Sequence, residues 1–271
     1  MRGDQLRSRL EVGAPVLGTW AQTPSPELIE ILGLVGFDFV VLDMEHGYFG
    51  AESLPNLIRA AELSGTAALV RVPREAPEQV SKALDLGAPG VVVPGIGTRE
   101  EAASFVARTR FPPAGGRGAS LSTRELRYSA RQLPELLASG VRPLVVLQVE
   151  AVLATANLDD ILQVEGLDVL FIGPFDLAAS LGLPGQLQHP DVLRAIRSIC
   201  DRARQRGVTV GLWTREPETV GGWIETGVRF VTVSNNELIF FEAAQRLRRR
   251  LGRQAARAMR AAATRSAAAG R

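Results

Sequence analysis

The segment GFDFVVLDMEHG, residues 36–47, contains the pattern from which the fold of this chain can be worked out. A glycine is followed by an almost unbroken apolar run, and the run ends in a cluster of two acids and a histidine. An apolar run of this length is typical of a parallel strand that is covered on both faces. The segment therefore predicts a buried strand whose carboxyl end carries polar side chains.

The same unit recurs along the chain, because short β-branched runs alternate with segments of helical period. The expected strands are residues 16–22, 38–46, 67–73, 90–96, 142–150, 167–174, 209–213 and 229–235. Ser25 and Pro26 are suited to the N-cap and first position of a helix. Glycines that close a helix before a strand are expected at Gly36, Gly65, Gly87, Gly207 and Gly227. Eight strand–helix units predict a single-domain α/β fold, the (β/α)8 TIM barrel.

Two segments depart from this repeat. Residues 111–141 are too long for a simple helix-to-strand turn, and we expect a long connection that contains a short helix. Residues 246–271 form a basic, Ala- and Arg-rich tail that we expect to be helical and partly disordered. The tail holds nine arginines and no acids, which leaves 22 basic and 29 acidic residues, a net charge of −7, in the barrel segment 1–245. A doubly wound open sheet is the alternative, although no G-x-G-x-x-G motif follows the first strand.

The composition excludes several classes of protein. Neither a membrane span nor a secretory signal is expected, because the apolar runs are only of strand length and none lies near the start. Cys200 is the single cysteine, which excludes an intrachain disulfide and fits a cytoplasmic location. Lys82 is the single lysine among 31 basic residues, and it lies in a helical segment away from the strand ends. A Schiff-base mechanism, which needs a lysine at the site, is therefore disfavoured.

Polar residues gather where the expected strands end, and in a barrel that is where the active site lies. They are Asp43, Glu45 and His46 after the second strand, Arg71 at the third, Gln148 and Glu150 at the fifth, and Asp176 at the sixth, where it follows Gly173 and Phe175. Ordinary alternatives exist: Asp176 could cap a helix, Arg71 could form a structural ion pair, and His46 could be a loop histidine. Because inward-facing charges are costly unless they are paired or liganded, we interpret the group as a functional site.

These residue types suit the chemistry of an enolate. Glu150 and Asp176 offer oxygen ligands without cysteine, a set that favours a hard divalent ion such as Mg²⁺ or Mn²⁺. Such an ion can polarise a carbonyl and stabilise an enolate. Arg71 can hold a keto oxygen, and His46 can move a proton, with Glu45 or Asp43 as the next candidate for the base. The set therefore predicts enolate chemistry on an oxo acid.

Six ordered segments resemble the HpcH/HpaI aldolase family, class II pyruvate aldolases that act on 4-hydroxy-2-oxo acids. They are GFDFVVLDMEHG (36–47), ALVRVP (68–73), KALDLGAPGVVVPGIGT (82–98), TRFPPAGGRG (109–118), LVVLQVE (144–150) and VLFIGPFDLAASLG (169–182). The resemblance extends over about residues 15–245. It implies a divalent metal cofactor (Mg²⁺, Mn²⁺ or Co²⁺), an oxo acid and an aldehyde as small-molecule partners, and a homo-oligomer, specifically a hexamer. We expect no nucleic-acid or membrane partner.

The resemblance also implies a role for individual residues. His46 matches the catalytic base, and Arg71 matches the arginine that stabilises the transition state. Glu150 and Asp176 match the metal ligands. Gln148 matches a residue that contacts the substrate.

The turn from Gly173 to Asp176 matches the site of the pyruvate carboxylate, where the backbone N–H groups of Phe175 and Asp176 would donate. Phe175 stands where the family commonly has a small residue, which predicts a narrower pocket. Asp85 matches an acid that raises the basicity of the histidine. Asp43 completes the expected catalytic group.

Asp85 raises a geometric problem within one barrel. The helix over residues 76–87 begins at the strand carboxyl ends and runs about 16 Å toward the opposite end, so Asp85 lies far from His46. We therefore expect the Asp85 of a neighbouring subunit to complete the site, with Arg117 and the 111–141 connection at the contact. The alternative is that Asp85 faces solvent at a helix end.

The sequence thus favours reversible cleavage of a 4-hydroxy-2-oxo acid to pyruvate and an aldehyde. Two enzymatic alternatives keep the same site: decarboxylation of oxaloacetate, and cleavage of a sugar acid of the 2-dehydro-3-deoxy-aldarate type. A third alternative is a non-catalytic barrel that binds a partner through its basic tail.

Overall fold

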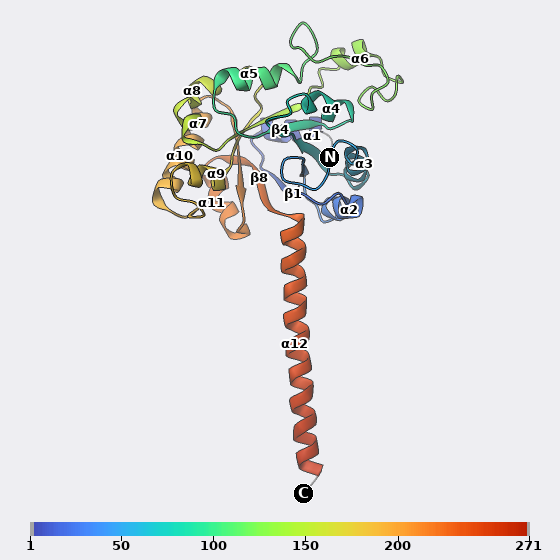
Figure 1. Ribbon diagram of the computed structural model, residues 1–271, viewed down its shortest axis with the longest axis vertical. Helices are drawn as coiled ribbons and strands as arrows, with labels where there is room; N and C mark the ends of the chain where they lie inside the picture. Colours follow the sequence, from blue (N-terminus) through green and yellow to red (C-terminus); the bar gives the residue numbers. More distant parts are fainter. Residues whose placement is uncertain (1–2, 270–271) are drawn as a thin grey trace.

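The chain closes into a parallel barrel of eight strands in which each strand pairs with the next and β8 pairs with β1 (Figure 1). The structure is a computed structural model, and it describes residues 3–269. The strands are β1 (Val16–Ala21), β2 (Phe39–Asp43), β3 (Ala67–Arg71), β4 (Gly90–Val93), β5 (Leu144–Val149), β6 (Val169–Ile172), β7 (Thr209–Thr214) and β8 (Val228–Asn235). All eight coincide with the expected segments to within a few residues, which confirms the (β/α)8 barrel.

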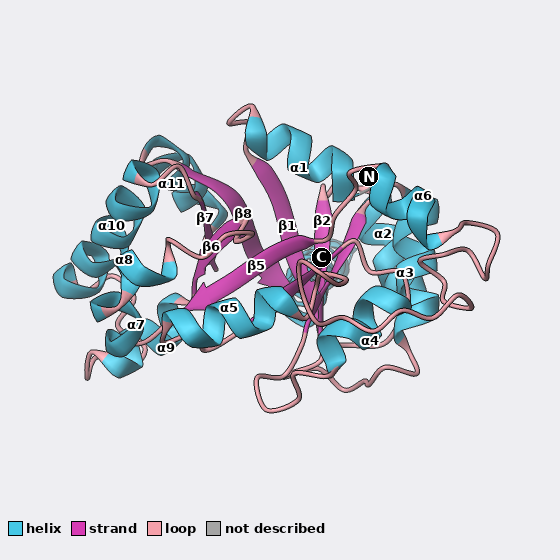
Figure 2. Ribbon diagram, turned by 90° about the horizontal axis from the view of Figure 1, so that it is seen from above, coloured by secondary structure: helices cyan, strands magenta, loops and turns pink. Residues whose placement is uncertain are grey.

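Helices surround the strands on the outside of the barrel (Figure 2). They are α1 (Gly3–Glu11), α2 (Pro26–Leu34), α3 (Leu54–Ser64), α4 (Gln79–Asp85), α5 (Arg99–Ala107), α6 (Leu133–Ala138), α7 (Val152–Ala156), α8 (Leu158–Ile161), α9 (Pro174–Ser180), α10 (Pro190–Gln205), the 3-10 helix η1 (Pro217–Thr219), α11 (Val220–Glu225) and α12 (Asn236–Ala269). Ser25 caps α2 as expected, because its hydroxyl accepts a hydrogen bond from the Leu28 N–H. The five glycines expected to close helices all have positive φ, between 70° and 102°.

Alternate strand residues face the barrel interior and form one apolar cluster. Aromatic rings fill its centre: Phe39 stacks on Phe230 with ring centroids 4.0 Å apart, and Phe171 meets Phe230 edge-on. Gly18 makes room for this packing, since a Cβ there would lie 2.4 Å from the Phe39 ring. The middle of the barrel is therefore packed with side chains.

Helix α1 closes the amino-terminal end of the barrel. Leu6 and Leu10 are buried in the interior cluster, while Arg7 and Arg9 form ion pairs with Asp168 and Asp38, respectively. The sequence did not predict this helix. With α1 packed against one end of the interior, the carboxyl ends of the strands form the opposite end.

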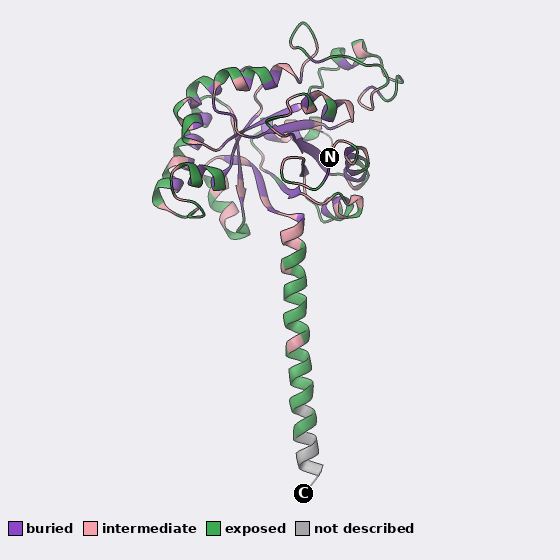
Figure 3. Cartoon of the chain, viewed as in Figure 1, coloured by how far each residue is buried: buried purple, intermediate pink, exposed green. Residues whose placement is uncertain are grey.

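Two segments extend from the barrel. The expected long connection joins α5 to β5 and contains α6. Helix α12 begins directly after β8 and stands away from the barrel with most of its surface exposed (Figures 1 and 3). The tail is therefore helical as far as Ala269, and its partial disorder stays a prediction. Of the residues described, none belongs to a helix long and apolar enough to cross a membrane.

Candidate active site

The two-residue period of the strands brings polar residues to the inner face at the carboxyl ends. In β2, Phe39 and Val41 belong to the interior cluster, and Asp43 is the next residue on that face. The strand register places Asp43 beside Arg71, the last residue of β3. Gln148 occupies the corresponding place on β5, after Val146. The structure thus brings together residues that the sequence placed at three strand ends.

Arg71 is held rigidly at this end of the barrel. Its Nε and Nη2 donate to the two carboxylate oxygens of Asp43 over 2.8 and 2.6 Å. Its Nη1 lies 3.0 Å from Oε2 of Glu45, and its guanidinium lies over the Trp20 ring at 4.4 Å. Two carboxylates and an aromatic face therefore fix the plane of a nearly buried guanidinium.

Asp43 is fully buried, and its carboxylate organises the surrounding turn. Besides Arg71, it accepts hydrogen bonds from Nε2 of Gln22 and from the backbone N–H groups of Glu45 and His46. Burial by itself would raise the pKa of Asp43, but the hydrogen bonds and charge of Arg71, with the bonds from Gln22 and His46, outweigh it and leave this pKa lowered. Asp43 is therefore ionised, and its carboxylate oxygens are occupied by hydrogen bonds. This suits a role in holding Arg71 in place better than a role in proton transfer.

His46 lies on the open side of this cluster, with 63% of its side chain exposed. Its Nε2 is 3.9 Å from Oε2 of Glu45, so one carboxylate lies near both the imidazole and the Arg71 guanidinium. Burial raises the pKa of Glu45, although the charges of Arg71 and His46 oppose this. A reacting group at the barrel mouth would have free access to the imidazole.

Glu150 directly follows β5, and its carboxylate is largely buried. Nε2 of Gln148 donates to Oε2 of Glu150, while Oε1 of Gln148 is buried without a hydrogen-bond partner among the described residues. Burial raises the pKa of Glu150 to about 7; the bond from Gln148 lowers it, and the charges of Asp176 and Glu45 raise it further. A carboxyl with this pKa is protonated in about half of the molecules at neutral pH, and a nearby positive charge would shift it toward the ionised form.

Gly173 makes room for this arrangement. A Cβ at Gly173 would lie 2.5 Å from Oε2 of Glu150 and 2.8 Å from Nε2 of Gln148. The glycine also serves as the N-cap of α9, and Asp176 lies in the first turn of that helix. Among residues 3–269 no side-chain hydrogen bond or salt bridge engages the Asp176 carboxylate, so its oxygens are available to a ligand.

The donor set fits a hard divalent cation. Across residues 3–269 no group of three His, Cys, Asp or Glu side chains converges as a complete metal site. Mg²⁺, however, is commonly held by one or two carboxylates together with water and substrate oxygens. Glu150 and Asp176 provide the two carboxylates, and the unpartnered Oε1 of Gln148 adds a polar atom beside them.

Phe175, which the sequence singled out, forms an aromatic wall with Trp213, which the sequence did not single out. Phe175, which is 47% exposed, lies 5.1 Å from the Trp213 ring, measured between centroids. Trp213 is fixed by a hydrogen bond from its Nε1 to the carbonyl oxygen of Ser234, whose own φ is +61°. Trp20 was missed as well. The only sequence signal for a role of these two tryptophans was their position near a strand end. That signal is weak, because an apolar residue in a strand usually packs in the core.

Asp85 does not join the site within its own chain. It is the last residue of α4, at the end of the barrel opposite to His46, as the sequence predicted. Its Oδ1 accepts a 2.7 Å bond from Arg117, a buried arginine that also binds Glu125. Lys82 lies on the exposed side of the same helix, away from the strand carboxyl ends.

Comparisons with known proteins agree with this geometry. A sequence profile of the HpcH/HpaI aldolase/citrate lyase family matches residues 17–242. A 5-keto-4-deoxy-D-glucarate aldolase from Salmonella paratyphi C (strain RKS4594) is 37% identical over 232 residues, which cover 85% of this chain and 90% of that protein.

Two solved structures share the fold. An HpcH/HpaI aldolase/citrate lyase family protein from Burkholderia cenocepacia J2315 is 32% identical, with a TM-score of 0.86 over 91% of this chain and 98% of its own. A citrate lyase beta subunit from M. tuberculosis, complexed with oxaloacetate and magnesium, is 16% identical, with a TM-score of 0.53 over 84% and 95% of the two chains, and it shows the likeness of fold alone. The chain therefore belongs to the HpcH/HpaI aldolase/citrate lyase family, and it is a carbon–carbon lyase of the aldolase type.

Proposed function

We propose that this aldolase reversibly cleaves a 4-hydroxy-2-oxo acid to pyruvate and an aldehyde and depends on a divalent metal. One observation carries the proposal: a fixed guanidinium, that of Arg71, and a largely buried carboxylate with a pKa near 7, that of Glu150, lie at the same barrel mouth. Glu45 links them, because it forms an ion pair with Arg71 and its charge raises the pKa of Glu150.

The residues of the chain divide the chemistry between them. Arg71, held by Asp43, presents a guanidinium of fixed direction to the oxygen that gains negative charge as the carbon–carbon bond breaks. His46 exchanges the proton of the substrate hydroxyl, and its exposed position allows it to return the proton to the solvent. Glu150 and Asp176 would hold the divalent cation, which when bound supplies Lewis-acid polarisation of the 2-oxo group. Gln148 keeps the Glu150 carboxylate in place.

We propose a sugar acid as the substrate class. The support is the 37% identity to a 5-keto-4-deoxy-D-glucarate aldolase over most of both chains. The test compares pyruvate release from 5-keto-4-deoxy-D-glucarate, a 4-hydroxy-2-oxo acid with an apolar tail, and oxaloacetate. Fastest release from the sugar acid is expected. Faster release from oxaloacetate would favour decarboxylation instead.

Metal dependence is tested by removing and restoring the cation. Excess chelator should abolish turnover, and Mg²⁺, Mn²⁺ or Co²⁺ should restore it. Glu150→Ala or Asp176→Ala should remove cation binding, measured by calorimetry, while the far-UV circular dichroism spectrum is unchanged. Glu165→Ala is the matched control, because 95% of that side chain is exposed. Full activity in chelator would refute metal dependence.

We also propose a homo-oligomer, the hexamer implied by the resemblance, in which a neighbouring subunit's Asp85 supports His46. Support comes from the first turns of α12, where three apolar residues, Phe240, Phe241 and Leu247, are between 57% and 69% exposed. Apolar surface of this kind on a helix is usually covered by another chain. Light scattering on a gel-filtration column would measure the state, and a monomer would contradict the proposal.

The shared site is tested by complementation. Inactive His46→Ala and Asp85→Ala chains are mixed under conditions that allow subunit exchange, and mixed oligomers should regain part of the activity. Asp85 also neutralises the buried Arg117, so the thermal stability of each variant is measured alongside. Proven exchange without recovery would show that Asp85 serves only the Arg117 ion pair.

A cytoplasmic location and the absence of nucleic-acid and membrane partners belong to the same proposal. The location rests on a single, buried cysteine. Deletion of residues 252–271 tests the basic tail: turnover should be retained, whereas a protein that works by binding through its tail would lose its function.

A further inference from the structure

A sugar acid of the proposed class carries a carboxylate at each end, and the barrel mouth must hold both. The carboxylate beside the 2-oxo group would lie at the turn from Gly173 to Asp176, while Arg71 faces the oxygen that gains negative charge. The far carboxylate would meet the acids of the mouth, Glu45 and Glu150 among them, which repel a further anion. A second cationic side chain at the mouth would therefore decide whether a dicarboxylic substrate binds.

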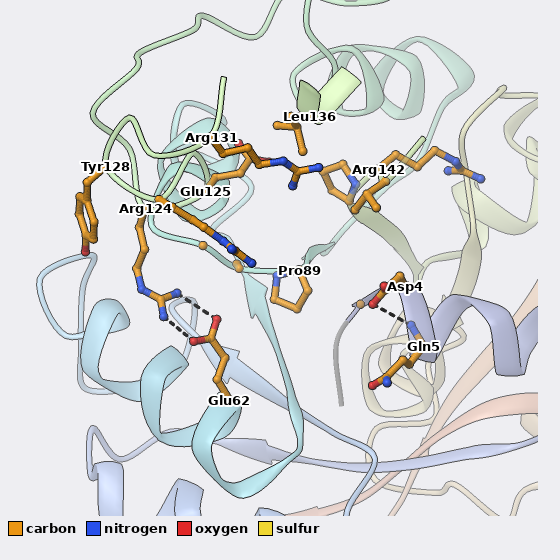
Figure 4. A pocket seen from close by; sticks show the side chains of 16 residues that line it. Asp4, Gln5, Glu62, Pro89, Arg124, Glu125, Tyr128, Arg131, Leu136 and Arg142 are labelled. Carbon is orange, nitrogen blue, oxygen red and sulfur yellow. Dashed lines mark hydrogen bonds and ion pairs between the residues drawn. The ribbon is translucent and has the colours of Figure 1, made fainter. Parts of the chain in front are cut away.

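Among residues 3–269, two arginines lie in connections that lead from the carboxyl end of a strand to the next helix. Arg74 follows β3, and Arg215 follows β7. The arginines of the long connection lie at the opposite end of the barrel, where Arg124 pairs with Glu62 (Figure 4). Arg74 and Arg215 are therefore the candidates at the mouth of their own barrel.

The side chain of Arg74 lies across Gly95, next to the Glu150 carboxylate. A Cβ at Gly95 would lie 3.1 Å from Cδ and 3.4 Å from Nη1 of Arg74. The backbone of Gly95 also hydrogen-bonds to the Glu150 carboxylate. Gly95 has a φ of +66°, so the glycine suits this turn and leaves room for the arginine. One residue thus separates Arg74 from a carboxylate that is proposed to hold the cation.

A single carboxylate holds Arg74 and leaves much of its guanidinium free. Nη2 of Arg74 donates to Oε1 of Glu101, whose Oε2 accepts backbone hydrogen bonds from Gly97 at 2.8 Å and Thr98 at 3.2 Å. Glu101 is thereby fixed at the start of α5. Within residues 3–269, Nε and Nη1 of Arg74 donate to no protein acceptor, and 46% of the side chain is exposed. Arg74 therefore has a fixed place and donors available to a ligand carboxylate.

Arg215 is less firmly held. Its Nη2 lies 3.9 Å from Oε1 of Glu242 on α12, which is beyond hydrogen-bond distance, and 57% of its side chain is exposed. No residue that is proposed to hold the cation packs against it. Arg215 therefore offers a comparison with Arg74: an arginine of the same mouth that is not placed beside Glu150.

We propose that Arg74 selects dicarboxylic substrates by binding the far carboxylate of the sugar acid. The inference rests on the proposed function and assigns its substrate class to one residue. In a six-carbon substrate the far carboxyl carbon is separated from the 2-oxo carbon by roughly 5 Å, at about 1.5 Å per carbon–carbon bond. A substrate held at Glu150 can therefore extend to the guanidinium beside Gly95, which binds carboxylate oxygens through charge-assisted hydrogen bonds. The aldehyde that is released would itself carry this carboxylate.

The first experiment measures condensation of pyruvate with two aldehydes that differ only in their far group. They are 2-hydroxy-3-oxopropanoate, which ends in a carboxylate, and glyceraldehyde, which ends in a hydroxymethyl group. The unmodified protein should have the lower KM for the carboxylated aldehyde. Arg74→Gln should raise that KM by about 10–100-fold, as expected for a lost charge-assisted hydrogen bond, and should leave kcat and the glyceraldehyde kinetics unchanged. Arg74→Lys keeps the charge and should recover part of the loss.

The second experiment measures binding without turnover. Calorimetry compares 2-oxoadipate, which has both carboxylates but no 4-hydroxyl group to cleave, with 2-oxohexanoate, which lacks the far carboxylate. Arg74→Gln should weaken binding of 2-oxoadipate by about the same factor as the KM and leave that of 2-oxohexanoate unchanged. Arg215→Gln is the matched control and should bind both compounds like the unmodified protein. Light scattering should show the same oligomeric state for every variant.

Four results would overturn the proposal: an unchanged preference in Arg74→Gln, equal weakening for both members of a pair, a loss of the same size in Arg215→Gln, or an altered oligomeric state in Arg74→Gln. The last would show that Arg74 serves a contact between subunits. An unmodified protein that accepts glyceraldehyde but rejects the carboxylated aldehyde would contradict this inference alone. Absence of turnover with either aldehyde would refute the proposed function, and this inference with it.

Discussion

Replacing Glu150 with glutamine should stabilise the metal-free protein at alkaline pH while it abolishes cation binding and turnover. The folded protein raises the pKa of this carboxyl from its ordinary value of 4.5 to about 7, chiefly through burial. A pKa difference of that size corresponds to about 3 kcal/mol between the ionised and protonated forms. Glu150→Gln keeps the shape of the side chain and removes the charge.

The pH dependence has a definite sign. Because the folded state binds this proton more tightly than the unfolded state, the contribution of Glu150 to stability is fully present below pH 4.5. It is lost as the pH rises through 7, so metal-free wild type should lose about 3 kcal/mol between pH 4.5 and pH 8 relative to Glu150→Gln. In a chain of this size the difference amounts to roughly 6–12 °C in melting temperature.

The assay is urea denaturation in excess chelator at pH 5, 6, 7 and 8, followed by circular dichroism. The free energies of unfolding of wild type and Glu150→Gln should differ least at pH 5 and diverge as the pH rises. Glu165→Gln, at an exposed position, should track wild type throughout. Parallel pH profiles for wild type and Glu150→Gln, or a less stable variant at pH 8, would refute the reasoning. Added Mg²⁺ should stabilise only the wild type.

Three further substitutions test other parts of the site. His46→Ala should lower turnover by about 10²–10⁴-fold, as for the loss of an acid–base group, and a rate within a few-fold of wild type would move the base elsewhere. Gly173→Ala places a methyl group 2.5 Å from a Glu150 oxygen, so calorimetry should show cation affinity reduced by about 10–100-fold; unchanged affinity would contradict the close packing. Phe175→Ala opens the aromatic wall with Trp213 and should raise kcat/KM for a bulky aldehyde over a small one by roughly 10–200-fold. An unaltered ratio would place the aldehyde away from this wall.

The barrel could be predicted from sequence because each of its signals is local. In a run such as residues 38–46, the apolar residues indicate that the strand is buried, and Asp43, Glu45 and His46 indicate where the strand ends. The two-residue period then assigns every side chain to a face once one of them is placed. Asp43 and Arg71 come together for this reason, since their strands are neighbours in register.

Other features depend on partners that are distant in the sequence. Helix α1 has only Leu6 and Leu10 buried, too few to show a helical period, and its role depends on an open barrel end that exists only after folding. The pairing of Arg117 with Asp85 spans 32 residues and was not foreseen. Phe175 was noticed because it follows the sixth strand, yet the ring that packs against it, that of Trp213, lies on β7.

Several departures from ordinary folding rules lie at the barrel mouth, and these support a catalytic site there. Glu150 is a largely buried carboxylate without an arginine or lysine ion-pair partner in the described chain, and its neighbour Gln148 has an unpartnered oxygen. Ser234 adopts a left-handed backbone to receive the Trp213 hydrogen bond. Each of these features costs stability in the free protein, and a bound cation or substrate would offset the cost at Glu150 and Gln148. The interior below them, which is filled by aromatic and aliphatic side chains, shows no such departure. The mouth is therefore less stable than its scaffold until a ligand binds there, and the stability of Glu150→Gln relative to wild type measures that difference at Glu150.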